Sequence, residues 1–145
     1  MSKHILVPLD GSDPSWDAFN HALDRYAGEQ ITVLHVVDPA EGVYMGYDGG
    51  YYDGEAFDRA VDRGEALCER ARERLEERDE TGETVFDEAV ETGRPAQTII
   101  QYATDHPVDH IVIGSHGRSG VSRLLLGSVA ETVLRRAAVP VTIVR

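Results

Sequence analysis

Unbroken apolar runs, separated by segments of helical periodicity, constrain the fold of this chain more than any other feature. Ile31 to Val37 is apolar at most positions, and His4 to Leu9 and Val108 to Gly114 follow the same pattern. A strand with one solvated face alternates apolar and polar residues, whereas a strand covered on both faces does not. The runs therefore predict parallel strands buried between two layers of helices.

Helical patterns fill the intervals between these runs. In the first interval Asp13 stands where an N-cap belongs, Pro14 takes the first helical position, and Gly28 ends the helix. The pattern over residues 55–78 predicts a long helix with a charged outer face. Its expected buried residues are Phe57, Val61, Leu67, Ala71 and Leu75.

Two further strands, Thr84 to Glu91 at a sheet edge and Val141 to Val144, complete a single domain over residues 1–145. Shorter helices over 96–103 and 129–137 precede the last two strands. Five strands alternating with four helices predict a doubly wound α/β fold with right-handed crossovers. The strand order 3-2-1-4-5 would bring the polar loops after strands 1 and 4 into one crevice, where such sheets bind ligands.

A glycine-rich stretch, GSHGRSGVSRLLLGS, begins at Gly114, where a side chain would fill that crevice. Its last residue, Ser128, begins the sequence Ser-Val-Ala-Glu, a capping-box pattern that predicts a helix start. Glycine amides, a serine hydroxyl and a helix N-terminus together suit a phosphate group, and Arg118 and Arg123 could add positive charge. The glycines could instead serve tight turns alone. Neither the Walker A pattern nor G-x-G-x-x-G after the first strand is present.

Four stretches, HILVPLDGSDPS, LHVVD, VDHIVIGSHGRSG and LLLGSVAETVLRRAAVPVTIVR, carry a family pattern over essentially the whole chain. Gly114, Gly117, Gly127 and Ser128 match the spacing G-x2-G-x9-G-[ST] without a gap. In these features the sequence resembles the universal stress protein family, specifically its ATP-binding branch.

The resemblance implies a site for ATP and Mg²⁺. It implies that the phosphates are held by Gly117, Gly127, Ser128 and the amide of Val129, and Arg118 is included among the candidate binding residues for its positive charge. It implies that Pro8, Leu9 and Asp10 border the ribose and adenine, and that Asp10 contacts the ribose or the metal ion. It further implies that the main chain of Val36 reads the adenine edge and that Ile113 and Gly114 line the same crevice.

The implied function is a nucleotide-dependent regulator or sensor, because no general base stands beside a nucleophile and no second carboxylate is paired with Asp10. A slow ATPase or nucleotidyl-transfer enzyme is one alternative, and an interaction module without nucleotide is another. The strand Val141 to Val144 would lie at an open sheet edge, which tends to pair with another strand. We therefore expect a homodimer through this strand, as the resemblance also implies. A monomer whose sheet edge is protected by its short length and by the overall charge is the alternative.

The net charge of −12, from 26 acidic and 14 basic residues, argues against sequence-independent binding of nucleic acid. Lys3 is the only lysine, and such acid-rich, lysine-poor composition resembles cytoplasmic proteins of salt-loving archaea. An ordinary acidic bacterial protein is the other interpretation. No apolar run approaches the ~20 residues of a membrane span, and no signal peptide is evident, so a cytoplasmic protein is expected.

Some residues allow two interpretations. His116 suits a loop hydrogen bond or acid–base catalysis, and Arg94 suits a surface position or a phosphate contact. The tyrosine- and glycine-rich segment from Val43 to Gly54 suits a connecting loop or a lid over adenine. Cys68, the single cysteine, is interpreted as a small core residue rather than a nucleophile. The other histidines lack ligand spacing.

Overall fold

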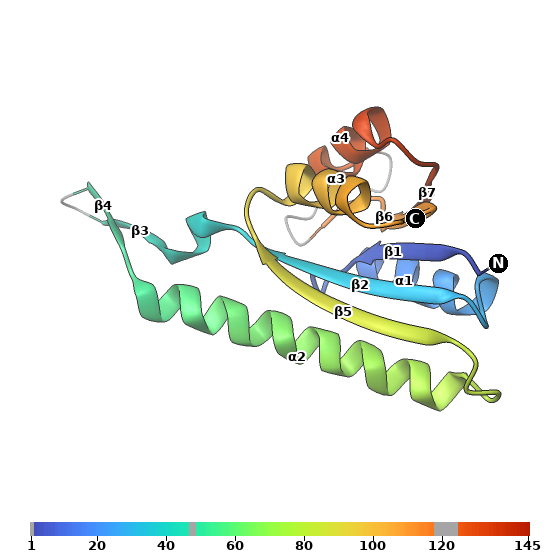
Figure 1. The fold of residues 1–145 in the computed structure, drawn as a ribbon. Helices are drawn as coiled ribbons and strands as arrows, with labels where there is room; N and C mark the ends of the chain where they lie inside the picture. Colours follow the sequence, from blue (N-terminus) through green and yellow to red (C-terminus); the bar gives the residue numbers. More distant parts are fainter. Residues whose placement is uncertain (1, 47–48, 118–124) are drawn as a thin grey trace.

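Five parallel strands form the central sheet of the computed structural model, which describes residues 2–46, 49–117 and 125–145 (Figure 1). The strands are β1 (His4–Pro8), β2 (Gln30–Val37), β5 (Val85–Thr92), β6 (His110–Gly114) and β7 (Val141–Val144). Their spatial order is β5-β2-β1-β6-β7, and each neighbouring pair is parallel. This order confirms the predicted 3-2-1-4-5 arrangement, with β1 at the point where the chain reverses direction across the sheet.

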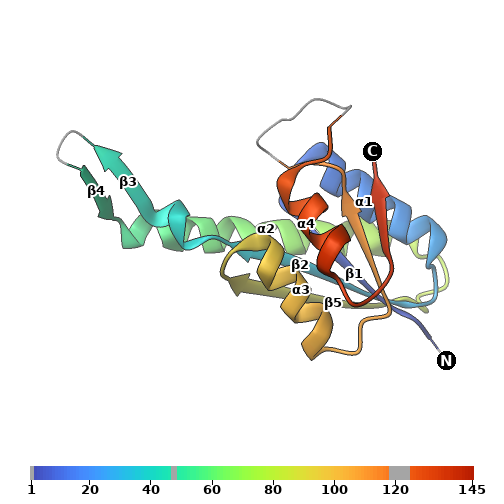
Figure 2. The same cartoon turned by 90° about the horizontal axis from the view of Figure 1, so that it is seen from above.

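Helices cover both faces of this sheet. The helices α1 (Asp13–Arg25) and α2 (Gly54–Arg78) lie on one face, and α3 (Pro95–Asp105) and α4 (Ser128–Arg136) lie on the other (Figures 1 and 2). Along β1 the side chains of Ile5 and Val7 join the core under α1 and α2, whereas Leu6 joins the core under α3 and α4. Both faces are therefore apolar, which explains the unbroken apolar run.

The first helix begins one residue earlier than predicted. Ser12, not Asp13, is the N-cap, and its hydroxyl oxygen accepts a hydrogen bond from the amide of Ser15 at 3.3 Å. Asp13 is consequently the first helical residue and Pro14 the second. A carboxylate in the first turn still favours the helix, since that end of the helix dipole is positive.

The long helix α2 packs on the sheet through a stripe of small residues. Its buried residues are Ala56, Ala60, Gly64, Cys68, Ala71 and Leu75. The expected burial of Phe57, Val61 and Leu67 is only partial, because the helix approaches β2 too closely for large side chains. At Gly64 an added Cβ would lie 2.4 Å from Cδ2 of His35. Neither α2 nor any other helix of the described residues is long and apolar enough to cross a membrane.

Cys68, on the buried face of α2, is a core residue, as the sequence predicted, with 1% of its surface exposed. Burial, followed by the nearby charges of Glu88 and Glu65, raises the pKa of this thiol to about 12. With an ordinary thiol pKa near 8.5, the unfolded chain should hold at least about 100-fold more thiolate at pH 8. We therefore expect no reaction of Cys68 with a chromogenic disulfide reagent in the native protein and full reaction in denaturant. Rapid native labelling would contradict this expectation.

The segment between β2 and α2, interpreted from the sequence as a connecting loop or a lid, contains regular structure. A 3₁₀ turn, η1 (Pro39–Gly42), leads into β3 (Val43–Gly46), which pairs antiparallel with β4 (Gly49–Tyr52). Both views show this hairpin projecting past the end of the sheet, away from α3 and α4 (Figures 1 and 2). The lid over adenine stays a prediction, and it would require the hairpin to turn back over the sheet.

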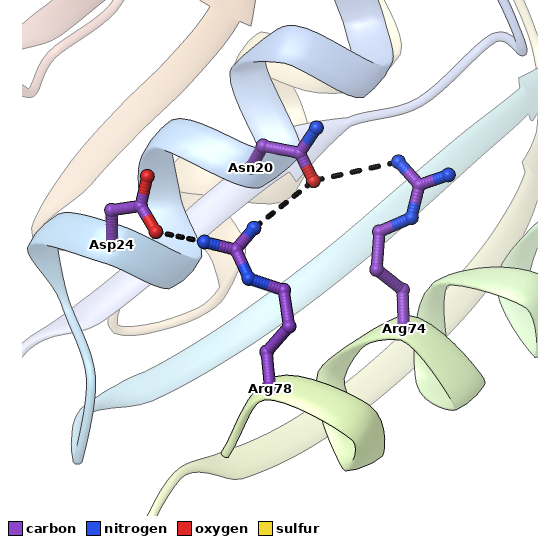
Figure 3. Close-up of polar contacts among 4 residues, drawn as sticks. All are labelled: Asn20, Asp24, Arg74 and Arg78. Atoms are coloured by element: carbon purple, nitrogen blue, oxygen red, sulfur yellow. Dashed lines mark hydrogen bonds and ion pairs between the residues drawn. The ribbon is translucent and has the colours of Figure 1, made fainter.

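Arginine side chains of α2 tie that helix to α1. The amide oxygen of Asn20 accepts hydrogen bonds from Arg74 and Arg78, at 3.4 and 3.3 Å (Figure 3). Arg78 also forms an ion pair with Asp24. Exposed pairs of this kind each contribute only about 0–1 kcal/mol, so they offset little of the repulsion among the excess carboxylates.

We accordingly expect the protein to gain stability with salt. Ions screen repulsion among the carboxylates behind the net charge of −12, and the screening length falls to about 3 Å at 1 M. The midpoint of thermal unfolding should rise by about 5 °C or more between about 0.1 and 2 M KCl. A variant in which exposed Glu76 and Glu77 are both glutamine should show a smaller rise. A flat or falling midpoint would contradict salt adaptation.

Candidate functional site

A cavity of about 560 Å³ lies at the carboxyl ends of β1, β2 and β6, where the strand order reverses. Doubly wound sheets bind their ligands at this position. Ten of the residues predicted from the sequence line it together: Pro8, Leu9, Asp10, Val36, Ile113, Gly114, Gly117, Gly127, Ser128 and Val129. Arg118, also predicted, lies outside the described residues, as does Arg123. The structure therefore brings the two predicted loops to one cavity.

The three signature glycines permit close approaches between the loops. An added Cβ at Gly114 would lie 2.6 Å from the carbonyl carbon of Pro14, and one at Gly117 would lie 2.5 Å from Oδ2 of Asp10. At Gly127 it would lie 3.0 Å from Cα of His116. The expectation for Gly114 is thus corrected, because a side chain there would meet the backbone of the first turn of α1.

The N-terminus of α4 faces the cavity, and no side chain among the described residues caps it. Gly127 is the N-cap and Ser128 the first helical residue, so the predicted capping box, which needs Ser128 as the N-cap, does not form. Ser128, Val129 and Ala130 all line the cavity. The first amides of a helix have no partner within it and carry the positive end of the helix dipole. This part of the cavity can therefore receive an anionic group.

Two other helices begin at the same cavity. Ser15 in the first turn of α1 and Pro95 at the start of α3 both line it. Arg94 is the N-cap of α3 and is exposed, which agrees with the surface position considered for it. Three helix N-termini thus contribute positive potential to one cavity.

Carboxylates from the ends of β1 and β2 line the same cavity. Asp10 accepts a hydrogen bond from the amide of Ser12 at 2.9 Å, which orients its side chain at the start of the β1–α1 loop. Asp38 and Glu41 hold the turn after β2: Glu41 accepts from the amide of Asp38 at 3.0 Å, and Asp38 accepts from the amide of Ala40 at 2.9 Å. The cavity therefore combines dipoles suited to anions with oxygen acceptors suited to hydroxyl, amino or metal groups.

His116 lines the cavity and makes a loop hydrogen bond. Its Nδ1 lies 3.1 Å from Oγ of Ser115, a buried side chain. The amide of Gly127 donates to the carbonyl oxygen of Ser115 at 2.7 Å, which joins the two ends of the glycine-rich stretch. This arrangement agrees with the structural interpretation of His116.

Several residues of the cavity were not predicted as site residues. They are Ser15, Leu34, Asp38, Glu41, Pro95, Ile99, His116 and Ala130. A usable signal existed for Asp38 and Glu41, because they directly follow a parallel strand next to β1 and so share its edge of the sheet. Pro95 and Ile99 gave no such signal, because only tertiary packing brings α3 over the end of β2.

Comparisons with known proteins agree with this architecture. The family model described as the universal stress protein family matches residues 1–145. A universal stress protein of Methanocaldococcus jannaschii is 32% identical over 158 residues, covering 100% of this chain and 96% of its own. The solved UspA of Lactobacillus plantarum superposes with a TM-score of 0.82 at 25% identity, covering 99% of this chain and 97% of its own. A universal stress protein in complex with cAMP shares the fold, with a TM-score of 0.72 at 24% identity over 99% of this chain and 97% of its own. The chain belongs to the universal stress protein family.

Proposed function

We propose that this protein binds an adenine nucleotide, ATP with Mg²⁺, in the cavity at the ends of β1, β2 and β6, and acts as a nucleotide-dependent regulator or sensor. One observation carries the proposal: Gly117, Gly127 and Ser128 share a single cavity with Asp10 and Val36. A volume of about 560 Å³ is within the usual range for small-molecule sites.

The two chemical halves of the cavity match the two halves of a nucleotide. The uncapped amides of α4 at Ser128 and Val129 suit the phosphates. Leu34, Val36 and Ile99 offer apolar contact for the base, and Asp38 and Glu41 beside them offer acceptors for amino and hydroxyl hydrogens. This arrangement suits a base with an exocyclic amino group, which donates hydrogen bonds, and adenine is such a base.

Asp10 is placed to hold a metal ion together with phosphate oxygens. Its Oδ2 lies 2.5 Å from the point that a Cβ of Gly117 would occupy, so the carboxylate borders the glycine-rich loop. Mg²⁺ commonly binds through one or two carboxylates plus substrate phosphates and water. No group of three or more acidic, histidine or cysteine side chains in the described ranges could hold a metal by itself. A bound Mg²⁺ would neutralise charge between Asp10 and the phosphates.

The identity of the nucleotide is tested by release from the purified protein. The solved relative in complex with cAMP supports an adenine ligand, whereas the assignment to ATP rests on the signature glycines and Asp10. Denaturation followed by mass spectrometry should identify an adenine nucleotide, and calorimetry on the emptied, refolded protein should show Mg²⁺-dependent ATP binding. No released nucleotide together with no ATP binding would contradict the proposal.

We further propose a homodimer through β7, whose outer edge pairs with no other strand of the described residues. The amide of Ile111 donates to Pro140 and the amide of Ser115 donates to Val144, so alternate residues of β7 bond to β6. The amide and carbonyl of Val141 and Ile143 consequently point to the open edge. Two copies can pair antiparallel at this edge about a two-fold axis.

The opposite edge of the sheet is less suited to pairing. There β5 carries Asp87, Glu88 and Glu91 within eight residues. Two such strands placed edge to edge would bring like charges together, whereas Val141–Val144 has no ionisable side chain. Charge therefore favours β7 over β5 as the interface.

A further inference from the structure

The β3–β4 hairpin (Val43–Gly46 and Gly49–Tyr52) stands apart from the central sheet. Within the described ranges its two strands pair only with each other. Both views show the hairpin projecting past the end of the sheet (Figures 1 and 2). A two-stranded hairpin by itself is only marginally stable in water. A small free energy supplied at its base can therefore decide whether this hairpin is formed or open.

The base of the hairpin is closed by one backbone hydrogen bond. The amide of Asp53 donates to the carbonyl oxygen of Gly42 at 2.6 Å. Gly42 is buried at the end of η1, and Asp53 is the N-cap of α2. The carboxylate of Asp53 accepts from the amides of Glu55 and Ala56, at 3.0 and 3.3 Å. This hydrogen bond therefore joins the end of η1 to the start of a long helix, with the hairpin between them.

The turn that precedes the hairpin is held by two carboxylates of the nucleotide cavity. Glu41 accepts from the amide of Asp38 at 3.0 Å, and its own amide donates to the carbonyl oxygen of Asp38 at 2.9 Å. Asp38 accepts from the amide of Ala40 at 2.9 Å. Both carboxylates line the nucleotide cavity, and Glu41 and Asp10 also line a second cavity, of about 290 Å³, beside α2. Glu41 therefore lies between the nucleotide cavity and the base of the hairpin.

We propose that a nucleotide in the cavity stabilises the β3–β4 hairpin through the turn over residues 38–41, so that the state of the hairpin depends on whether the cavity is occupied. This inference rests on the proposed nucleotide function. The ligand meets the carboxylates of Asp38 and Glu41 together only where the formed turn places them, so it binds the formed turn more tightly than an open one. The formed turn also brings Gly42 opposite Asp53, which lowers the entropic cost of closing the hairpin.

Hydrogen exchange in the full chain tests the effect of the nucleotide on the hairpin. Exchange over residues 43–53 is followed by mass spectrometry without ligand and with Mg²⁺ and ATP, at a concentration that saturates the protein by calorimetry. Exchange of the paired amides should slow at least about threefold. The turn over residues 79–82, at the other end of α2, is the internal control and should exchange at the same rate in both samples.

The effect of the hairpin on the nucleotide is tested by closing the hairpin with a disulfide. Val43 and Tyr52 are paired, and the next pair, Gly42 and Asp53, is hydrogen-bonded. Val43 and Tyr52 are therefore a non-hydrogen-bonded pair, whose Cα atoms are typically about 4.5 Å apart, a separation that suits a disulfide. In Val43→Cys/Tyr52→Cys the oxidised form should bind ATP at least about threefold more tightly than the reduced form, because coupling is reciprocal. Cys68 is buried and should not compete.

The role of the turn is tested by Glu41→Ala, which removes the acceptor for the amide of Asp38. At an ATP concentration that saturates this variant, the slowing of hairpin exchange should fall below about 1.5-fold. The control Glu80→Ala removes an exposed carboxylate outside both cavities and should keep the full slowing. Thermal melts confirm that each variant is folded. If Glu41→Ala does not bind ATP, the comparison of the oxidised and reduced forms still decides the proposal.

Three results would overturn the proposed coupling and leave the nucleotide function standing. The first is ATP binding with unchanged exchange of the hairpin, and the second is equal ATP affinity of the oxidised and reduced forms. The third is full slowing in Glu41→Ala, which would show that the ligand acts on the hairpin by another route. Absence of ATP binding to the parent protein would overturn both the nucleotide function and the coupling.

Discussion

Replacing Gly117 with valine is expected to weaken ATP binding at least about 100-fold, which corresponds to about 2.7 kcal/mol. The first carbon of the new side chain would lie 2.5 Å from Oδ2 of Asp10, so that carboxylate must move from the wall of the cavity. The branched side chain would also occupy the space proposed for the phosphates. Both effects weaken nucleotide binding. Gly117 lies in a loop outside the sheet and its helices, so the substitution should leave the fold intact.

The measurement is an ATP titration by calorimetry in the presence of Mg²⁺. Ala138→Val, which adds the same branching at an exposed position outside the cavity, should bind ATP as the parent protein does. The Gly117→Val protein should keep its helical circular dichroism and most of its thermal stability. Unchanged ATP affinity in a folded Gly117→Val protein would show that the nucleotide does not bind at this glycine.

The second large effect is expected at the sheet edge, where Ile143→Pro should separate the proposed dimer. The amide of Ile143 points to the open edge, so its loss spares the bonds between β7 and β6. By two-fold symmetry the dimer loses two hydrogen bonds, about 2 kcal/mol in total, and also meets the proline ring. The dissociation constant should rise at least about 30-fold.

Light scattering at micromolar concentration and high salt measures this change. Ile143→Ala keeps the backbone amide and should retain more dimer than Ile143→Pro at equal concentration. Thr142→Pro removes an amide that faces β6 and should lower the thermal stability of the subunit itself. A monomer-sized species for the parent protein would disprove the dimer. An unchanged dimer in Ile143→Pro would show that the interface does not include this edge of β7.

Much of the fold could be predicted because its signals are local. Apolar runs without alternation identified strands covered on both faces, and β1 shows why, with Ile5 and Leu6 in different cores. The errors occurred where local signals compete. Ser12 and Asp13 are both good N-caps, and only the geometry of the β1–α1 loop selects Ser12. Likewise, periodicity favoured Phe57 and Val61 as core residues, but close packing of α2 selected Ala56 and Ala60.

The candidate site could be predicted only where its residues lie in a continuous motif or directly follow a strand. Gly117, Gly127 and Ser128 have a recognisable spacing, and Asp10 ends the first strand. Pro95 and Ile99 come from a helix distant in the sequence, and nothing local marks them as neighbours of Val36. Their place in the cavity follows from the packing of α3 over the carboxyl end of β2.

The sequence by itself determined the class of fold and the glycine loop, because each depends on periodicity or on spacing within one segment. It also indicated the strand order, because polar loops follow two separate strands and doubly wound sheets bind ligands where such loops meet. The tertiary structure alone decided that Asp10 lines two cavities. It also decided that Val36 lines one of these cavities and its neighbour His35 the other. It also decided that Arg63 and Arg70 lie beside Asp10, although more than 50 positions separate them in the chain. Such placements depend on how closely α2 packs on the sheet, which Gly64 permits by leaving room for His35. Close packing is a property of pairs of surfaces, and a single stretch of sequence does not contain it.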